Sequence, residues 1–294
     1  MSVFDRTAQL SNKAKGILCI LAAAFGFSLM TVFVRLAGED VPSFEKAFFR
    51  NFVALIVVMV IMLKRKDSFI PGKGNFKFLF ARAACGTIGL LCNFYAIDHL
   101  VLADANMLNK LSPFFAIIFS IFILKEKPTI VQIVGVLVAF IGSLFIIKPG
   151  FASADIFASV MGLIGGLGAG IAYTFVRKLG FRKENSSLII LFFSAFSCIV
   201  CLPLIAIDYV PLTKWSLGCL VLAGLFATLG QFGITKAYVY APAKEISVYD
   251  YTQIIFAAFF GYLIFDQIPD GFSVIGYLLI CGAGIAMFLY NKKK

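Results

Sequence analysis

The sequence is poor in charged residues and contains a single histidine. Only 14% of its 294 residues are charged, whereas 61% are hydrophobic. A water-soluble domain of this composition would expose a large apolar surface. With His99 alone and no paired catalytic motif, the sequence offers no nucleophile, acid–base pair or metal-ligand set typical of an intramembrane enzyme. We therefore expect a membrane protein without enzymatic activity, cofactor or metal.

The chain also lacks polar segments long enough to form a soluble domain. Apolar stretches of about 20 residues, enough to cross ~30 Å of hydrocarbon as a helix, follow one another with short breaks. We expect an all-α membrane protein with ten transmembrane helices. Their expected ranges are Gly16–Leu36, Phe44–Leu63, Phe76–Ile97, Ala103–Leu124, Thr129–Ile147, Ile156–Val176, Leu188–Ile207, Leu217–Tyr238, Ala243–Phe265 and Gly271–Tyr290.

Lysine and arginine gather in every second loop. If the amino terminus is cytoplasmic, the loops on that side hold most of the basic residues, and the opposite loops hold few bases and several acids. The positive-inside rule then places both termini in the cytoplasm of a multi-pass inner-membrane protein. The net charge of +11 has the same cause, because no base-stacking motif accompanies the cations. We expect the lipid bilayer, and no nucleic acid, as the partner of these residues.

The two halves of the chain repeat. Shifts of 142 and 141 residues superpose several short matches in a common register, among them Arg35 on Arg177, Gly89 on Gly230 and Asn109 on Asp250. We expect two five-helix units, residues 1–148 and 149–294. Because five is odd, the second unit enters the membrane upside down, which gives an inverted repeat. This symmetry favours a transporter, since it provides similar inward-open and outward-open states.

Polar side chains within these apolar helices indicate where a transport path runs. They are costly in lipid, so they should face a cavity or one another. Arg82, Gly86, Gly89 and Asn93 recur at helical spacing and form one stripe. Lys236 lies nearer a helix end, where reaching the headgroups is the alternative to lining the cavity. The expected substrate-binding residues are Asn93, Asn106, Lys110, Tyr173, Gln231, Lys236, Tyr249, Asp250 and Gln253.

The expected ninth helix is unusually polar for a membrane interior. We expect Glu245, Tyr249 and Gln253 to share a face, and Asp250 to lie about 100° round from Tyr249. Asp250 or Glu245 is a candidate for proton or charge coupling, and a purely structural ion pair is the alternative for Asp250. Facilitated diffusion or exchange needs no titrating group. The candidate counter-ions of Asp250 are Lys110 and Lys236.

This set of charged, amide and tyrosine side chains suits a small polar substrate. A zwitterionic or mixed-charge metabolite, such as an amino acid or an amine, fits it better than a flat hydrophobic drug. The alternatives are an exporter of amino acids or drug-like compounds, an uptake carrier for vitamins or nucleosides, and a non-transporting receptor or channel-like pore. Import, export and pairing into a homodimer are all compatible with the sequence.

Several motifs carry a resemblance to a known family. Two five-helix halves, Phe49-Arg50-Asn51-Phe52 early in the second helix, Leu111-Ser112-Pro113, Glu126 and Gly135 resemble the EamA-type drug/metabolite transporters over nearly the whole chain. The resemblance implies a central cavity lined by helices 1, 3, 4, 6, 8 and 9, with helices 5 and 10 peripheral. We expect structural roles for Arg50, Pro113 and Glu126, with Arg50 bonding to phosphates or carbonyls or paired with Glu45.

A narrower resemblance concerns the bacterial S-adenosylmethionine uptake carriers. It is carried by Ser43-Phe44-Glu45, by Tyr249 and Tyr251, and by Pro269-Asp270. It implies an S-adenosylmethionine-like substrate. This chain has Asp250 where those carriers have a basic residue and Gln253 where they have an acid, so the resemblance does not fix the substrate.

Overall fold

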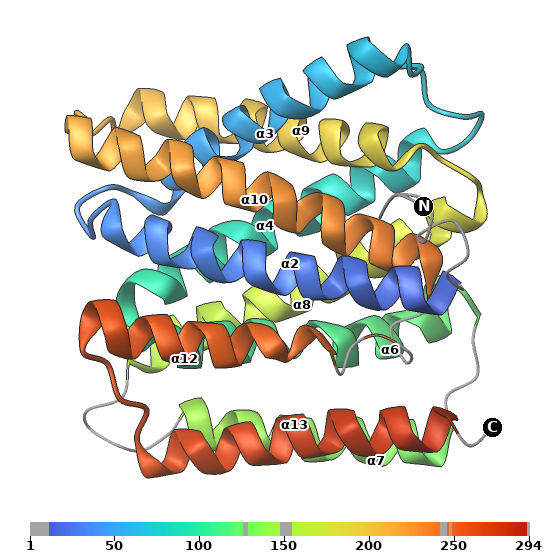
Figure 1. Cartoon of the computed structure of the whole chain (residues 1–294), viewed down its shortest axis with the longest axis vertical. Coiled ribbons are helices and arrows are strands. Elements are labelled where there is room, and N and C mark those ends of the chain that lie inside the picture. The colour runs from blue at the N-terminus through green and yellow to red at the C-terminus, as the bar shows by residue number, and fades with distance from the viewer. Residues whose placement is uncertain (1–11, 126–128, 148–154, 242–245, 247–248, 293–294) are drawn as a thin grey trace, which may run out of the picture.

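The computed structural model describes residues 12–125, 129–147, 155–241, 246 and 249–292. These residues form eleven helices and no strand, so the all-helical expectation is confirmed for them (Figure 1). The helices are α2 (Asn12–Leu36), α3 (Ser43–Arg65), α4 (Phe76–His99), α5 (Leu102–Asn109), α6 (Ser112–Ile123), α7 (Ile130–Ile147), α8 (Ile156–Phe181), α9 (Ser186–Ile207), α10 (Lys214–Tyr240), α12 (Thr252–Phe265) and α13 (Gly271–Lys292).

Local sequence signals set the helix ends. The Asp155 carboxylate accepts a hydrogen bond from the Ala158 N–H at 2.8 Å and caps α8. Thr213 caps α10 in the same way, through the Ser216 N–H. At the end of α3, Lys66 adopts a left-handed backbone with φ 56°. Caps of this kind satisfy the free backbone groups of a helix terminus, so the chain reverses in short connections.

The bundle has an apolar outside and a polar inside. Large hydrophobic side chains such as Leu137, Ile199 and Leu278 are more than half exposed. Lys110 and Asp250, in contrast, are 4% and 1% exposed. This distribution suits a protein surrounded by lipid, where the surrounding medium is as apolar as a protein core.

Eight helical segments of the described residues are long and apolar enough to cross a membrane, with Leu102–Ile123 counted as one segment. Two further apolar helices, Ile133–Ile146 and Thr252–Phe265, are shorter. A multi-pass membrane protein is therefore confirmed. All ten segments fall within or overlap the ranges expected from the sequence, and the count of ten membrane crossings stays a prediction.

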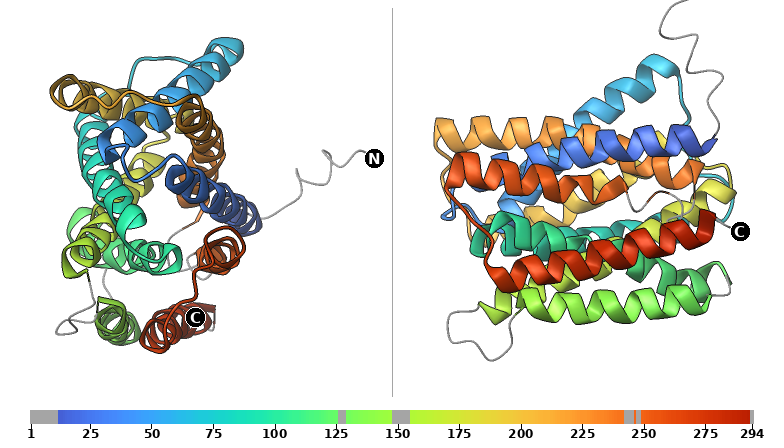
Figure 2. Two further views of the ribbon diagram at one scale, coloured as in Figure 1. Left: turned by 90° about the vertical axis from the view of Figure 1, so that its left-hand side faces the viewer. Right: turned by 60° about the horizontal axis from the view of Figure 1, so that its bottom comes forward.

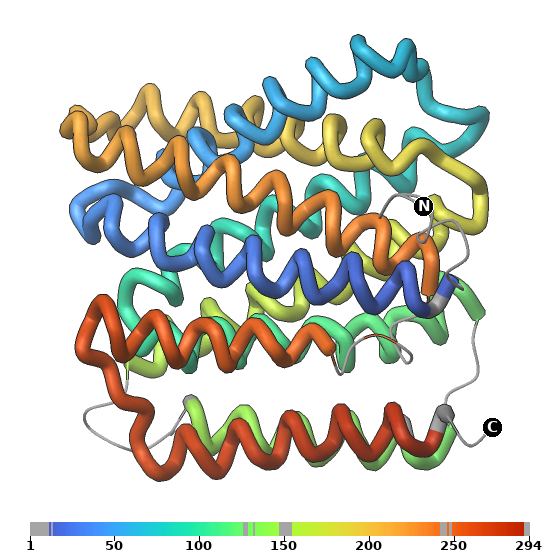
Figure 3. Tube along the Cα trace, viewed as in Figure 1, coloured from blue at the N-terminus to red at the C-terminus, as the bar shows by residue number. Residues whose placement is uncertain are grey.

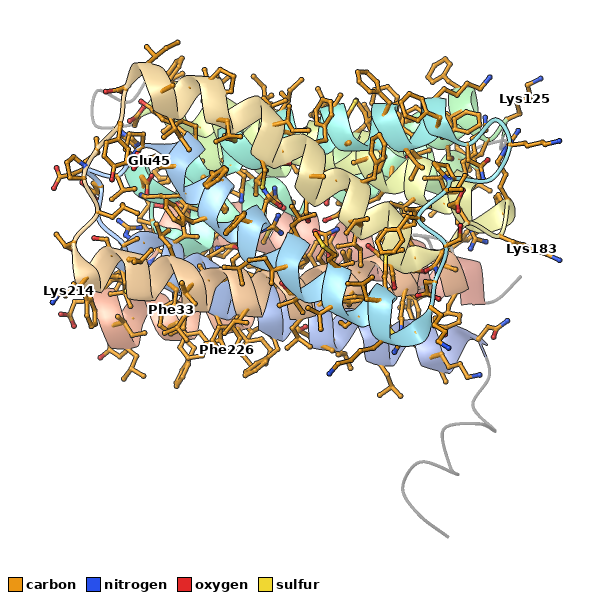
Figure 4. The ribbon with its side chains drawn as sticks, turned by 90° about the horizontal axis from the view of Figure 1, so that it is seen from above. Phe33, Glu45, Lys125, Lys183, Lys214 and Phe226 are labelled. Carbon is orange, nitrogen blue, oxygen red and sulfur yellow. The ribbon has the colours of Figure 1, made fainter. Side chains whose placement is uncertain are left out.

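The helices associate in reciprocal pairs. Helix α2 packs along α10, and α4 packs along α8. Helices α7 and α13 lie side by side at one edge of the bundle (Figures 2 and 3). Helix α2 begins and α13 ends at the same end of the bundle (Figure 1). Lys125 and Lys183 lie at that end, and Glu45 and Lys214 lie at the other (Figure 4).

Glycines allow the closest helix contacts. A Cβ atom added at Gly26 of α2 would lie 2.8 Å from the Gly230 backbone N of α10. A Cβ added at Gly168 of α8 would lie 2.8 Å from Gly89 Cα of α4. No larger residue fits either crossing without displacing backbone. The shifts that relate the two halves also relate these two contacts, because Gly26 corresponds to Gly168 and Gly230 to Gly89.

The expected helix Ala103–Leu124 is not continuous. It ends at Asn109, turns through Lys110 and Leu111, and resumes as α6. Pro113 lies in the first turn of α6, where its missing N–H costs no hydrogen bond. The Leu111 N–H donates to Leu108 O, three residues back, at 3.2 Å. The helical ladder therefore breaks beside Lys110, in the middle of an expected span.

A second interruption lies in the other half. Tyr251 forms a turn between the helical residues 249–250 and α12. Tyr251 corresponds to Lys110 under the 141-residue shift, so both interruptions fall at the same place in the repeat. Interrupted membrane helices leave backbone groups free, and these breaks occur where the chain lines a cavity or packs against protein.

Candidate substrate cavity

A cavity lies inside the bundle, where the two halves of the chain meet. The cavity volume open to the centres of water-sized molecules is about 70 Å³, which is enough for several waters. Its lining comes from α2, α3, α4, α8, α9, α10 and α12 and from the α5–α6 interruption. The residues that line it are Phe27, Met30, Thr31, Arg50, Arg82, Gly86, Gly89, Leu90, Asn93, Asn109, Lys110, Ala169, Ala172, Tyr173, Phe193, Gln231 and Gln253.

The polar stripe predicted on α4 faces this cavity. Arg82, Gly86, Gly89 and Asn93 all line it, so the helical spacing identified the inward face of α4 correctly. Asn93 Oδ1 is buried without a hydrogen-bond partner in the described part of the chain. An unpaired amide oxygen beside a cavity is available to a solute.

An ion pair joins the two interrupted helices. Lys110 Nζ lies 2.7 Å from Asp250 Oδ2, so Lys110, and not Lys236, is the counter-ion of Asp250. Lys110 belongs to the first half of the chain and Asp250 to the second. The pair therefore links the two halves beside the cavity. Asp250 Oδ1 is buried and has no hydrogen-bond partner in the described residues.

Amide side chains add a second link between the halves. Gln253 Nε2 donates to Asn106 Oδ1 at 2.7 Å. The Ser28 hydroxyl donates to the backbone carbonyl of Gln253 at 3.2 Å. Gln253 lines the cavity, whereas Asn106 does not line it and contacts Gln253 instead. Asn106 also donates to the Leu102 carbonyl at 2.7 Å, so its orientation is fixed.

Two arginines lie in the cavity wall. Arg50 Nη1 donates to Asn51 Oδ1 at 2.8 Å, and Arg50 Nη2 approaches Gln231 Oε1 at 3.4 Å. The Arg82 guanidinium lies over the Phe193 ring at 3.8 Å from its centroid. Both arginines are almost fully buried. Arg50 therefore does not reach the membrane surface, and contact with lipid phosphates is wrong for it.

Glu45 is not the partner of Arg50. Its Oε1 accepts a hydrogen bond from the Val210 N–H at 3.1 Å, at the end of the bundle away from the cavity. The separation of five residues places the two side chains on different faces of α3. The expected pairing of Arg50 with Glu45 is therefore wrong.

Only some of the other expected substrate-binding residues face the cavity. Tyr173 and Gln231 line it, but Lys236 and Tyr249 do not. Tyr249 packs edge to face on Phe288 at 5.6 Å. Gln253 lines the cavity, and the turn at Tyr251 lies between it and Tyr249. Glu126 and Glu245 lie outside the described residues.

Among the lining residues outside the expected binding set, Arg50, Arg82 and Phe193 bear most on the chemistry of the cavity. Arg82 lies on the stripe already identified and could have been selected as its charged member. Arg50 was expected to be structural, and Phe193 had no signal, because it is one of 34 phenylalanines. Through Arg50 and Phe193, helices α3 and α9 also contribute to a cavity expected to involve only the equivalents of α2, α4, α5–α6, α8, α10 and α12.

Comparison with known families identifies the chain. The model of the EamA-like transporter family matches it twice, over residues 14–148 and 156–290. The chain belongs to the EamA-like transporter family. Both matches together cover most of the sequence, in agreement with the resemblance seen in its motifs.

Curated relatives of this EamA-like chain carry the names of transporters. It is 33% identical over 279 residues to the pseudopaline exporter CntI of Pseudomonas aeruginosa, covering 94% of this chain and 97% of that protein. It is 26% identical over 288 residues to an S-adenosylmethionine uptake transporter of Rickettsia prowazekii, covering 97% and 96%. A riboflavin transporter of Brucella anthropi is 26% identical over 280 residues, covering 90% and 95%.

A solved crystal structure shares the fold of this EamA-like protein. It matches with a TM-score of 0.73 over 95% of this chain and 98% of its own, at 13% sequence identity. At that identity the likeness bears on the fold alone.

Proposed function

We propose that the chain is a secondary transporter that moves a small polar, mixed-charge metabolite across the cytoplasmic membrane by alternating access. The observation that carries this proposal is the Lys110–Asp250 pair beside a buried cavity, at the two interrupted helices. Charged groups at helix interruptions inside a membrane protein are typical of substrate or ion sites. We propose no enzymatic activity, because the family and its curated relatives are named for transport.

Alternating access requires two related halves, residues 1–148 and 149–294. Reciprocal contacts support this inverted repeat. Gly26 of α2 contacts Gly230 of α10, and Gly168 of α8 contacts Gly89 of α4, so each contact joins one half to the other with the partners exchanged. When a contact between halves recurs with its partners exchanged, a twofold axis relates the halves. Five spans per half then place that axis in the membrane plane.

The substrate is proposed to reach the cavity from each side in turn. About 70 Å³ accommodates several waters but not a typical metabolite. The cavity must therefore enlarge as the halves rock. The Lys110–Asp250 and Asn106–Gln253 contacts cross between the halves, so they would rearrange in that motion. Asp250 is the proposed coupling residue, and Glu245 remains a second candidate.

The membrane orientation is proposed from charge. Lys125 and Lys183 lie at the end of the bundle where α2 begins and α13 ends, and Lys214 lies at the opposite end (Figure 4). By the positive-inside rule, the excess of basic residues at the first end supports a cytoplasmic location for it in an inner membrane. Both termini are then cytoplasmic. The relatives include an exporter and an uptake transporter, so both directions of transport fit this family.

The test is counterflow in proteoliposomes. Vesicles containing the purified full chain are loaded with a metabolite extract, diluted, and analysed by mass spectrometry for solutes that exchange. We expect one class of polar solute to exchange with saturation. Vesicles without protein are the control. Exchange of no solute, or a conductance that does not saturate, would contradict a carrier and favour a receptor or a pore. Repeating the assay with an imposed pH gradient tests proton coupling.

A further inference from the structure

Two buried cations in the cavity wall have no acidic partner. Arg50 and Arg82 are 3% and 2% exposed, and neither forms an ion pair within the described residues. We propose that Arg50 and Arg82 form an oxyanion site that binds a carboxylate or phosphate group of the transported solute. This inference rests on the proposed function and narrows its substrate to a metabolite that carries at least one such group.

The contrast with the other buried cations supports the site. Lys46 pairs with Asp98 at 2.5 Å and Lys110 pairs with Asp250 at 2.7 Å. A buried charge without a partner is strongly unfavourable, and arginine does not lose its proton to escape this. Among the described residues, the cavity therefore holds three cations against one carboxylate. An anionic solute supplies the missing charge.

Free hydrogen-bond donors point to the chemistry of the ligand. Arg82 Nε and Nη1 and Arg50 Nε are buried without hydrogen-bond partners in the described part of the protein. A guanidinium offers donors in a planar fork that matches the two oxygens of a carboxylate or phosphate. These donors are unpaired beside a cavity that both side chains line.

Neighbouring residues hold the two guanidinium groups in place. The Phe193 ring faces both groups, and its centroid lies 3.8 Å from Arg82 Cζ and 5.7 Å from Arg50 Cζ. A Cβ atom at Gly86 would lie 2.9 Å from Arg82 Nη1, so glycine leaves room for this head group. A shared aromatic platform brings two like charges to one side of the cavity. That arrangement is unfavourable unless an anion bridges them.

The experiment measures thermal unfolding of the full chain in lipid nanodiscs. The probes are malonate and inorganic phosphate, titrated against chloride at constant ionic strength and pH, with malonamide as the neutral analogue. We expect malonate, phosphate or both to raise the unfolding temperature by several degrees with saturation, and malonamide to have no effect. Comparing malonate with phosphate identifies which oxyanion the site prefers.

Variants assign the effect to the site. Arg82→Gln and Arg50→Gln should abolish the saturable shift, and Arg82→Lys should weaken it about tenfold in half-saturating concentration, because the fork is lost and the charge kept. Arg182→Gln is the matched control, since Arg182 also lies over a ring, Phe78 at 4.9 Å, outside the cavity. No shift in the wild type, or an equal shift in Arg82→Gln, would overturn the proposal.

The two proposals can fail separately. Saturable counterflow of a solute that carries no carboxylate or phosphate would overturn the oxyanion site and leave the transporter intact. Saturable binding of malonate that requires Arg82, without counterflow of any solute, would retain the site and contradict the transport function.

Discussion

Two buried ion pairs of similar length lie in different parts of this bundle. Lys46 and Asp98 join the start of α3 to the end of α4 at 2.5 Å, and both belong to the first half of the chain. Lys110 and Asp250 join two helix interruptions at 2.7 Å, and they come from different halves. The first pair lies at one end of the bundle, while the second lies beside the cavity.

In the proposed rocking motion of the two halves, the position of an ion pair, and not its chemistry, decides whether its contact persists. A pair within one half keeps its partners when the halves move. A pair between the halves must rearrange. Removing one member of any buried pair costs about 3–5 kcal/mol, because the remaining charge is left unpaired. Single variants therefore damage both pairs alike, and double neutral variants distinguish them.

The largest expected effect is on transport. In the double variant Lys110→Met/Asp250→Asn neither substituted position leaves a charge without its partner, so the protein should still fold. Counterflow should fall by about 100-fold or more, as expected when about 3 kcal/mol of interaction along the transport path is lost. Initial counterflow rates, with the unfolding temperature measured alongside, test this. Wild-type rates in a folded double variant would remove these two residues from the transport path.

The next effect is on stability and concerns the other pair. Lys46→Met or Asp98→Asn alone should lower the free energy of unfolding by about 3–5 kcal/mol. The double variant should recover most of that loss and transport within about threefold of wild type, because a neutral pair leaves no buried charge. Thermal unfolding and counterflow on the same samples provide the measurement. A folded double variant that does not transport would mean that the Lys46–Asp98 pair, like the Lys110–Asp250 pair, is required for transport.

A smaller effect is expected where helices from the two halves touch. Gly168→Ala places a methyl carbon 2.8 Å from Gly89 Cα, which is too close for two carbon atoms, and such overpacking costs about 1–3 kcal/mol. Gly218→Ala is the matched control on α10, because nothing lies within 4 Å of its added Cβ. Its effect should stay within about 0.5 kcal/mol. Equal unfolding temperatures for the two variants would mean that the α4–α8 contact is not tight.

Periodicity and hydropathy predicted much of this architecture. The helix ranges, the stripe Arg82 to Asn93 and the choice of Lys110 as one of two candidate counter-ions of Asp250 all depend on helical spacing or on the cost of charge in lipid, which a sequence displays directly. The turns at Lys110 and Tyr251 were not predicted. Pro113 cannot donate a hydrogen bond to the Asn109 carbonyl, so it favours a break beside Lys110, whereas the turn at Tyr251 has no comparable sequence signal.

Two site residues lie elsewhere than expected. Tyr249 precedes the turn at Tyr251 and lies outside the cavity, whereas Gln253 follows the turn and lines the cavity. Arg50 near the start of α3 has the sequence position of a headgroup-binding arginine. Its burial depends on α9 and α10 packing over α3, which the sequence of α3 does not encode. Long-range packing thus accounts for the errors at both places.

The smallest expected effect separates two tyrosines that the sequence treated alike. Tyr173 lines the cavity and stacks on Tyr238 at 4.8 Å, whereas Tyr249 packs on Phe288 away from it. Removing a hydroxyl that can bond to a solute should cost about 1 kcal/mol, so Tyr173→Phe should slow counterflow by about fivefold. Tyr249→Phe should stay within about twofold, because its ring contact is kept. The reverse order of the two rates would mean that Tyr249 enters the path in another state of the transport cycle.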